Sequence, residues 1–168
     1  MDKLQEVQDK FIHHWGTLGS AWGVNKTMTQ VHALLMVSED PVTTDDIMER
    51  LKISRGNAHT NVKELVSWGI ARQVIVPGER KDFYTAEKEP WKLLCTIARE
   101  RKRREIEPAI DAIVECLNES SGMKSKAAKE FRNQLSELQE FLEMAERILT
   151  RLGRSEKSKV IKWMMNLM

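Results

Sequence analysis

The sequence predicts a mainly α-helical fold with one small β-hairpin, and three observations support this prediction. Several long stretches repeat apolar residues every three or four positions, as amphipathic helices do. A stretch rich in β-branched residues, 70–76, is followed by Pro77-Gly78 and then by a second candidate strand at 83–85. No stretch approaches the roughly 18 uncharged apolar residues of a membrane-spanning helix, so we expect none.

The first expected helix covers residues 3–22 and has one apolar stripe, whose members are three or four positions apart. The stripe consists of Leu4, Val7, Phe11, Trp15, Leu18 and Trp22. Gly16, Gly19 and Gly23 weaken the end of this helix, so we expect the chain to turn within residues 23–27. The next helix should begin near Thr29 and end before Pro41, because the residue before a proline disfavours helix.

Residues 43–67 predict two helices joined by a tight turn. Thr43 can cap a short helix, with Asp46 three residues later returning the hydrogen bond. Ser54 offers a second N-cap, and the longer helix after it has one buried stripe formed by Ala58, Val62, Leu65 and Val66.

The first two turns of this second helix are left with a polar outer face. Arg and Asn can pair with purine edges in the major groove, while Ser, Thr, Lys and a helix N-terminus suit phosphate oxygens. We therefore predict that a double-stranded DNA operator is bound by Ser54, Arg55, Gly56, Asn57, His59, Thr60, Asn61 and Lys63.

A β-hairpin should follow the helix that ends at Gly69. Pro77-Gly78 fits the centre of a type II turn, and Arg80 and Lys81 at the tip can lie along a phosphate backbone. A helix-turn-helix with such a hairpin is a winged helix-turn-helix.

Residues 50–81 contain seven Lys or Arg and two acidic residues, so their net charge is +5, whereas the net charge of the whole chain is only +2. The alternative is a winged-helix scaffold that dimerises and binds protein without reading DNA.

Beyond the wing, Pro90 should open a long helix that reaches about Asn118, with a kink at Pro108. Five of the six residues 99–104 are basic, which fits a solvated surface or, alternatively, further phosphate contact or an acidic partner. Residues 119–123 form the clearest linker. We expect two regions, 1–89 for DNA binding and 90–168 for dimerisation.

A second long helix follows the linker, and its apolar residues alternate steps of four and three. They are Phe131, Leu135, Leu138, Leu142, Ala145, Leu149 and Leu152, and the preceding helix has a matching seam at Ile106, Ile110, Ile113 and Leu117. One helix cannot bury such a seam alone, so we predict a homodimer, with a monomeric helical hairpin as the alternative. A Met-rich helix from Ser155 should pack against this arm, with membrane-surface binding as its alternative.

Several other classes of protein are not supported. The chain has no phosphate-cradling Gly loop, no nucleophile elbow and no Cys or His set with metal-ligand spacing, so we expect no enzyme, metal or cofactor. Cys95 and Cys116 would lie roughly 30 Å apart on one helix and cannot pair. The N-terminus lacks an apolar signal core, so we expect a cytoplasmic protein.

Residues 53–110 resemble the GbsR branch of the MarR-type winged-helix regulators. The likeness rests on Ser-Arg-Gly-Asn at 54–57, Trp-Gly at 68–69 and Pro-Gly-Glu-Arg-Lys at 77–81. It implies a dimeric repressor, and the best-known members respond to choline. A quaternary ammonium effector needs an aromatic cage. Such a cage could be built from Trp22, Trp68, Tyr84 and Trp91, or these residues could belong to the domain core.

Overall fold

The computed structural model describes residues 3–154, and the expected Met-rich helix at 155–168 lies outside the described residues. The chain divides into two compact units, Met1–Leu93 and Leu94–Met168. None of the helices in the described part is long and apolar enough to cross a membrane.

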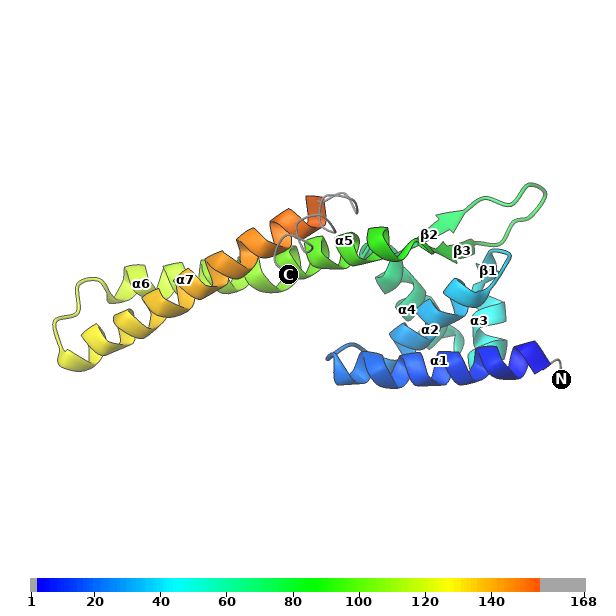
Figure 1. Cartoon of the computed structure of the whole chain (residues 1–168), viewed down its shortest axis with the longest axis horizontal. Coiled ribbons are helices and arrows are strands. Elements are labelled where there is room, and N and C mark those ends of the chain that lie inside the picture. Colours follow the sequence, from blue (N-terminus) through cyan, green and yellow to red (C-terminus); the bar gives the residue numbers. More distant parts are fainter. Residues whose placement is uncertain (1–2, 155–168) are drawn as a thin grey trace, which may run out of the picture. The chain divides into compact units, whose positions relative to one another are not determined.

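The first unit is a winged helix-turn-helix, as predicted (Figure 1). Its helices are α1 (Lys3–Ala21), α2 (Lys26–Val37), α3 (Thr44–Leu51) and α4 (Arg55–Ser67). Its antiparallel sheet has the order β1-β3-β2, from β1 (Val42–Thr43), β2 (Ala71–Val74) and β3 (Phe83–Ala86). The two-residue strand β1 was not predicted, because so short a segment has no readable alternation.

The α1 helix packs on α2 through a different face from the one predicted. Ile12, Gly16 and Gly19 are its buried residues. Most of the predicted stripe is exposed instead, with exposed fractions of 59% at Leu4 and 58% at Trp22. A Cβ atom added at Gly19 would lie 2.2 Å from Thr29 Cγ2, so these glycines permit close helix packing and do not break the helix.

The helix boundaries follow local capping. Asn25 accepts a hydrogen bond from Met28 N–H, so α2 begins three residues before the expected Thr29. Thr43 and Asp46 form the predicted capping box of α3: the Thr43 N–H donates to Asp46 Oδ2 at 2.8 Å, and the Asp46 N–H donates to Thr43 Oγ1 at 3.2 Å. Ser54 caps α4 by accepting from the Asn57 N–H at 3.3 Å.

The core of this unit lies where α2, α3, α4 and the sheet meet. Its largest fully buried side chains are Val31, Leu35, Ile47, Val62, Leu65 and Tyr84. At the far end of the hairpin, Gly78 has a φ of +86°, and the Glu79 N–H donates to the Val76 carbonyl at 3.1 Å. Both features agree with the predicted type II turn.

The helix that begins at Pro90 is interrupted near the predicted kink. It consists of α5 (Pro90–Arg101), a π-helical turn (Lys102–Ile106) and α6 (Glu107–Ser120). Pro108 has no N–H to donate to a carbonyl four residues earlier, and immediately before it the Glu107 N–H donates to Lys102, five residues earlier. The irregularity therefore precedes the proline.

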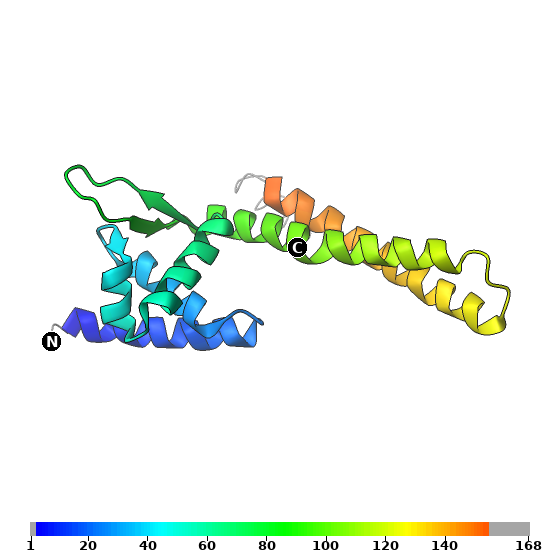
Figure 2. The same cartoon turned by 180° about the vertical axis from the view of Figure 1, so that it is seen from behind.

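The second unit contains a helical hairpin, in which α7 (Lys126–Arg154) returns along α6 (Figure 2). The α7 helix continues through Gly153. A Cβ at Gly153 would lie 2.6 Å from Arg99 Cγ, and the Arg99 guanidinium donates to the Gly153 carbonyl at 2.8 Å. This glycine therefore permits a close approach between α7 and α5.

The predicted seam is only partly covered within the chain. Ile113 is buried, and Ile110, Leu117, Leu135, Leu142 and Leu149 are half-buried. Phe131 and Leu138 remain 45% and 46% exposed, and Phe141 and Ile148 beside them are 59% and 60% exposed. The hairpin thus buries one side of α7 and leaves apolar side chains on the other.

Candidate nucleic-acid interface

The N-terminal half of α4 exposes most of the polar side chains that we predicted to contact DNA. Its exposed residues there are Arg55, Gly56, Asn57, His59, Thr60 and Lys63, and the N-cap Ser54 is exposed as well. Ala58 and Val62 are fully buried and fix which side of the helix faces outward. A Cβ at Gly56 would meet no other part of the described chain within 4 Å, so the helix backbone is open to an approaching ligand there.

The prediction that Asn61 faces outward is wrong, because this residue is buried inside the domain. Its exposed fraction is 8%. Its side-chain amide donates to the Asn57 carbonyl at 2.8 Å and to Asn57 Oδ1 at 2.6 Å. Asn61 is therefore placed to orient Asn57, and it does not reach a base edge itself.

The wing brings two further cations to this unit. Arg80 and Lys81 are both exposed, as predicted. Lys63 lies closer to the hairpin than expected: its ammonium is 3.4 Å from Gln73 Oε1 and 5.7 Å from the centre of the Tyr84 ring. Lys63 therefore links α4 to the sheet.

Asp45, in the first turn of α3, was not singled out from the sequence, yet it joins the wing to α4. Its Oδ1 accepts from Arg55 Nη2 at 2.5 Å, and its Oδ2 lies 3.2 Å from Lys81 Nζ. The Lys81 hydrogen bond, followed by the charge of Arg55, holds the pKa of Asp45 below its ordinary value. Only the usual preference for acidic residues in a first helical turn marked this position in the sequence.

These residues border a hollow of about 540 Å³, called here the Asp45 hollow. It is lined by Thr43, Thr44, Asp45, Arg55, Gly56, His59, Lys81 and Asp82. The N-termini of α3 and α4 both reach it, and backbone N–H groups at helix N-termini favour anions. The hollow therefore combines two side-chain cations and two helix N-termini with two carboxylates, Asp45 and Asp82.

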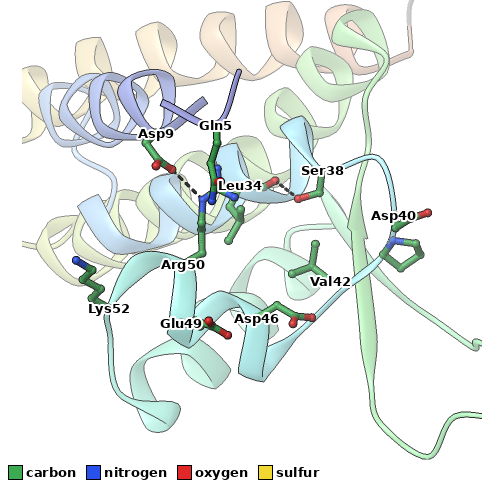
Figure 3. A pocket seen from close by; sticks show the side chains of 11 residues that line it. Gln5, Asp9, Leu34, Ser38, Asp40, Val42, Asp46, Glu49, Arg50 and Lys52 are labelled. Atoms are coloured by element: carbon green, nitrogen blue, oxygen red, sulfur yellow. Dashed lines mark hydrogen bonds and ion pairs between the residues drawn. The ribbon is translucent and has the colours of Figure 1, made fainter. Parts of the chain in front are cut away.

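A second hollow, between α1, α2 and α3, is occupied by interactions that hold the domain together (Figure 3). Arg50 Nε donates to Asp9 Oδ1 at 2.8 Å, and Arg50 Nη2 donates to Gln8 Oε1 at 3.2 Å. Asp46, another lining residue, belongs to the capping box of α3. Arg50 is one of the seven basic residues counted between 50 and 81, so part of that charge ties α3 to α1.

The basic run at 99–104 is largely paired within the second unit. Glu100 binds Arg103 at 2.6 Å and Arg104 at 3.1 Å, and Lys102 binds Glu107 at 2.7 Å and Glu146 at 3.1 Å. The hydrogen bond to Glu107, followed by the one to Glu146, raises the pKa of Lys102 above its ordinary value. The pairing favours a structural, solvated surface over a phosphate-binding one.

Tyr84 does not fit the predicted aromatic cage, because it belongs to the core. Tyr84 is 1% exposed, and its ring already faces the Lys63 ammonium. Trp22 packs edge-on against Trp15 at 6.0 Å between ring centroids, and Trp68 Nε1 donates to Glu64 at 2.9 Å. Trp91 is half-buried at the start of α5. The role of the three tryptophans in effector binding stays a prediction.

Within residues 3–154, no three His, Cys, Asp or Glu side chains are grouped so that they could hold a metal ion. The buried Cys95 thiol donates to the Leu152 carbonyl at 3.3 Å, and Cys116 is exposed.

Comparison with known proteins gives matches to a protein family, to a curated protein and to solved structures. Residues 22–82 match the model of the MarR family. The HTH-type transcriptional repressor GbsR of Bacillus subtilis (strain 168) is 23% identical over 112 residues, which make up 67% of this chain and 62% of that protein. The chain thus spans less than two thirds of that relative's length. A crystal structure of a transcriptional regulator has a TM-score of 0.72 at 18% identity and covers 86% of this chain and 95% of its own. At this identity, it shows a shared fold. The matches are to regulators of transcription and not to enzymes.

Proposed function

We propose that this chain, whose residues 22–82 match the model of the MarR family, is a cytoplasmic transcriptional repressor that binds a specific DNA operator. The proposal rests mainly on one observation. Arg55 of α4 and Lys81 of the wing converge on a single carboxylate, so the reading helix and the wing share one anion-binding region. Repression follows from the name of the Bacillus subtilis relative.

Within this proposal the outward residues of α4 divide into two groups. Arg55 and Asn57 read base edges in the major groove, and the Asn61 amide holds Asn57 in place. The other proposed contacts, to phosphate oxygens, come from Ser54, Thr60, Lys63, Arg80 and Lys81. Gly56 and His59 lie between these groups and allow the helix to approach the groove.

Homodimerisation through the C-terminal helices is part of the proposal. Its support is the exposed apolar side of α7, where Phe131, Leu138, Phe141 and Ile148 remain at least 45% exposed. A two-fold dimer would place two reading helices on half-sites about one helical turn apart. Leu138→Glu should then shift the protein from dimer to monomer by light scattering and weaken operator binding. The matched control is Ser136→Glu, at an exposed position on a different side of the same helix, and a monomeric wild-type protein would contradict the dimer.

Selection of binding sites from random DNA, followed by footprinting, tests the DNA proposal. A specific reader enriches a near-palindromic site, and its Arg55→Ala variant loses that preference while retaining binding to random duplex. Failure of the wild-type protein to enrich any sequence would favour the protein-binding scaffold. Footprints with and without choline test whether a quaternary ammonium modulates binding, and indifference to choline would remove that effector.

A further inference from the structure

The Asp45 contacts bear on how tightly the proposed regulator binds DNA. Each carboxylate oxygen binds a cation from a different element, Oδ1 from α4 and Oδ2 from the wing. In the proposed complex, phosphate oxygens would approach Lys81 and base edges would approach Arg55, so the bound duplex would contact both cations that Asp45 binds. Both ion pairs are partly solvent-exposed, with side-chain exposed fractions of 69% for Arg55, 60% for Lys81 and 41% for Asp45, so they can exchange partners.

We propose that Asp45 is an internal competitor of DNA: Asp45 binds Arg55 and Lys81 in the free protein and must release both when the duplex binds. The inference rests on the proposed DNA-binding function and extends it to a residue that limits affinity. Asp45 differs in this from Asp82, the other carboxylate that lines the hollow, whose oxygens accept from Gln73 at 2.7 Å and from the Tyr84 hydroxyl at 3.5 Å.

Release of Asp45 has a measurable consequence for the salt dependence of binding. A lysine that neutralises one phosphate releases about 0.9 of a counterion from the duplex. When that lysine must first leave a carboxylate, the freed carboxylate attracts cations from solution. The net number of counterions released on binding is therefore smaller. The logarithm of the binding constant should therefore fall less steeply with the logarithm of salt in the wild-type protein than in a variant without the carboxylate.

The test compares Asp45→Asn with wild type in titrations of a labelled random-sequence duplex between 0.05 and about 1 M salt. We expect the variant to have a salt slope steeper by up to about 0.9 and, if the curves meet near 1 M, a roughly eightfold higher affinity at 0.1 M. Glu6→Gln on the exposed surface of α1 removes the same charge away from the hollow and should leave both quantities nearly unchanged. In a Lys81→Gln background, Asp45→Asn should give a smaller gain.

A second measurement does not depend on DNA. Trypsin cleaves after Arg80 and Lys81, and loss of the Asp45 contact should make cleavage at the wing faster in Asp45→Asn than in wild type, with unchanged circular dichroism. If the variant is cleaved faster but binds DNA no more tightly than wild type, the contact orders the wing without competing, and the proposal is wrong. Equal cleavage and equal affinity would also overturn it.

These outcomes separate the proposal from the DNA-binding function on which it rests. If the wild-type protein binds neither random nor selected duplex, the DNA-binding function fails as stated. If only the Asp45→Asn variant then binds DNA, the result supports competition by Asp45. If neither protein binds DNA, the proposal that Asp45 competes with DNA is overturned.

Discussion

Replacement of Gly19 by alanine should destabilise the winged-helix unit, although alanine is the better helix former. The new Cβ would lie 2.2 Å from Thr29 Cγ2 and 2.7 Å from Thr29 Cβ. Rotation of the Thr29 side chain cannot relieve the second contact, because Cβ does not move with the rotamer. The Thr29 hydroxyl is also fixed by hydrogen bonds to the Lys26 carbonyl at 2.9 Å and the Asn25 carbonyl at 3.2 Å. The α1 and α2 helices must therefore move apart.

The magnitude follows from two opposing contributions. A glycine inside a helix costs about 1 kcal/mol relative to alanine, so the substitution gains about that much in helix propensity. Overpacking of a close contact costs about 1–3 kcal/mol, and separation of the helices also loosens the packing around Ile12 and Met28, which are 3% and 6% exposed. The difference is a net loss of up to about 2 kcal/mol in the free energy of unfolding.

Urea unfolding at one fixed protein concentration measures this difference, and two other glycines provide matched controls. Gly16→Ala should be milder, because its closest contact at 2.5 Å is with Gln30 Cγ in a flexible side chain. Gly56→Ala has open space and should raise stability by up to about 1 kcal/mol. If Gly19→Ala stabilises the protein as much as Gly56→Ala does, the close-packing explanation of Gly19 is wrong.

Three other predictions concern capping, DNA contacts and pH. Thr43→Ala should lower the free energy of unfolding by about 1 kcal/mol, measured in the same urea assay, because it removes the side-chain half of the capping box; an unchanged value would contradict the role of the cap. Arg55→Ala should cost about 1–3 kcal/mol at one operator position in competition assays, whereas Arg80→Ala should weaken all duplexes alike and flatten the salt slope; equal losses on cognate and random duplexes would refute this division. Burial lowers the pKa of His32 from 6.5 to about 4, and its Nε2 has no hydrogen-bond partner among the described residues. Because the unfolded chain then binds the proton more tightly, stability should fall as pH drops from 6.5 to 4, by up to about 3 kcal/mol, and a His32→Leu variant should show a flatter pH profile.

Features set by near neighbours in the sequence were the ones that could be predicted. The Thr43 and Ser54 caps depend on residues three positions away, and the type II turn depends on a glycine that tolerates a positive φ. Asn61 could also have been placed correctly, because it lies three residues after Ala58 and four before Leu65, within the buried arc of α4. Its polar character led to its assignment to the outer face.

Features set by distant parts of the chain could not be predicted. Asp45 meets Lys81 across 36 positions of sequence, and no local pattern encodes that contact. The choice of packing face on α1 is a similar case, because hydrophobic periodicity identifies an apolar face without naming its partner. Gly16 and Gly19 allow a tighter approach to α2 than the larger apolar side chains of the stripe would.

The exposed stripe of α1 then calls for its own explanation. Leu4, Val7, Leu18 and Trp22 are 45–59% exposed on a helix whose opposite face is already packed, and Phe11 and Trp15 stack between them with ring centroids 5.5 Å apart. Contiguous apolar surfaces of this kind are uncommon on monomeric proteins and mark contacts with partners. The same reasoning applies independently to the outer side of α7. Among the described residues, one side of α1 and one side of α7 therefore leave apolar side chains exposed, and the proposed homodimer would cover both surfaces.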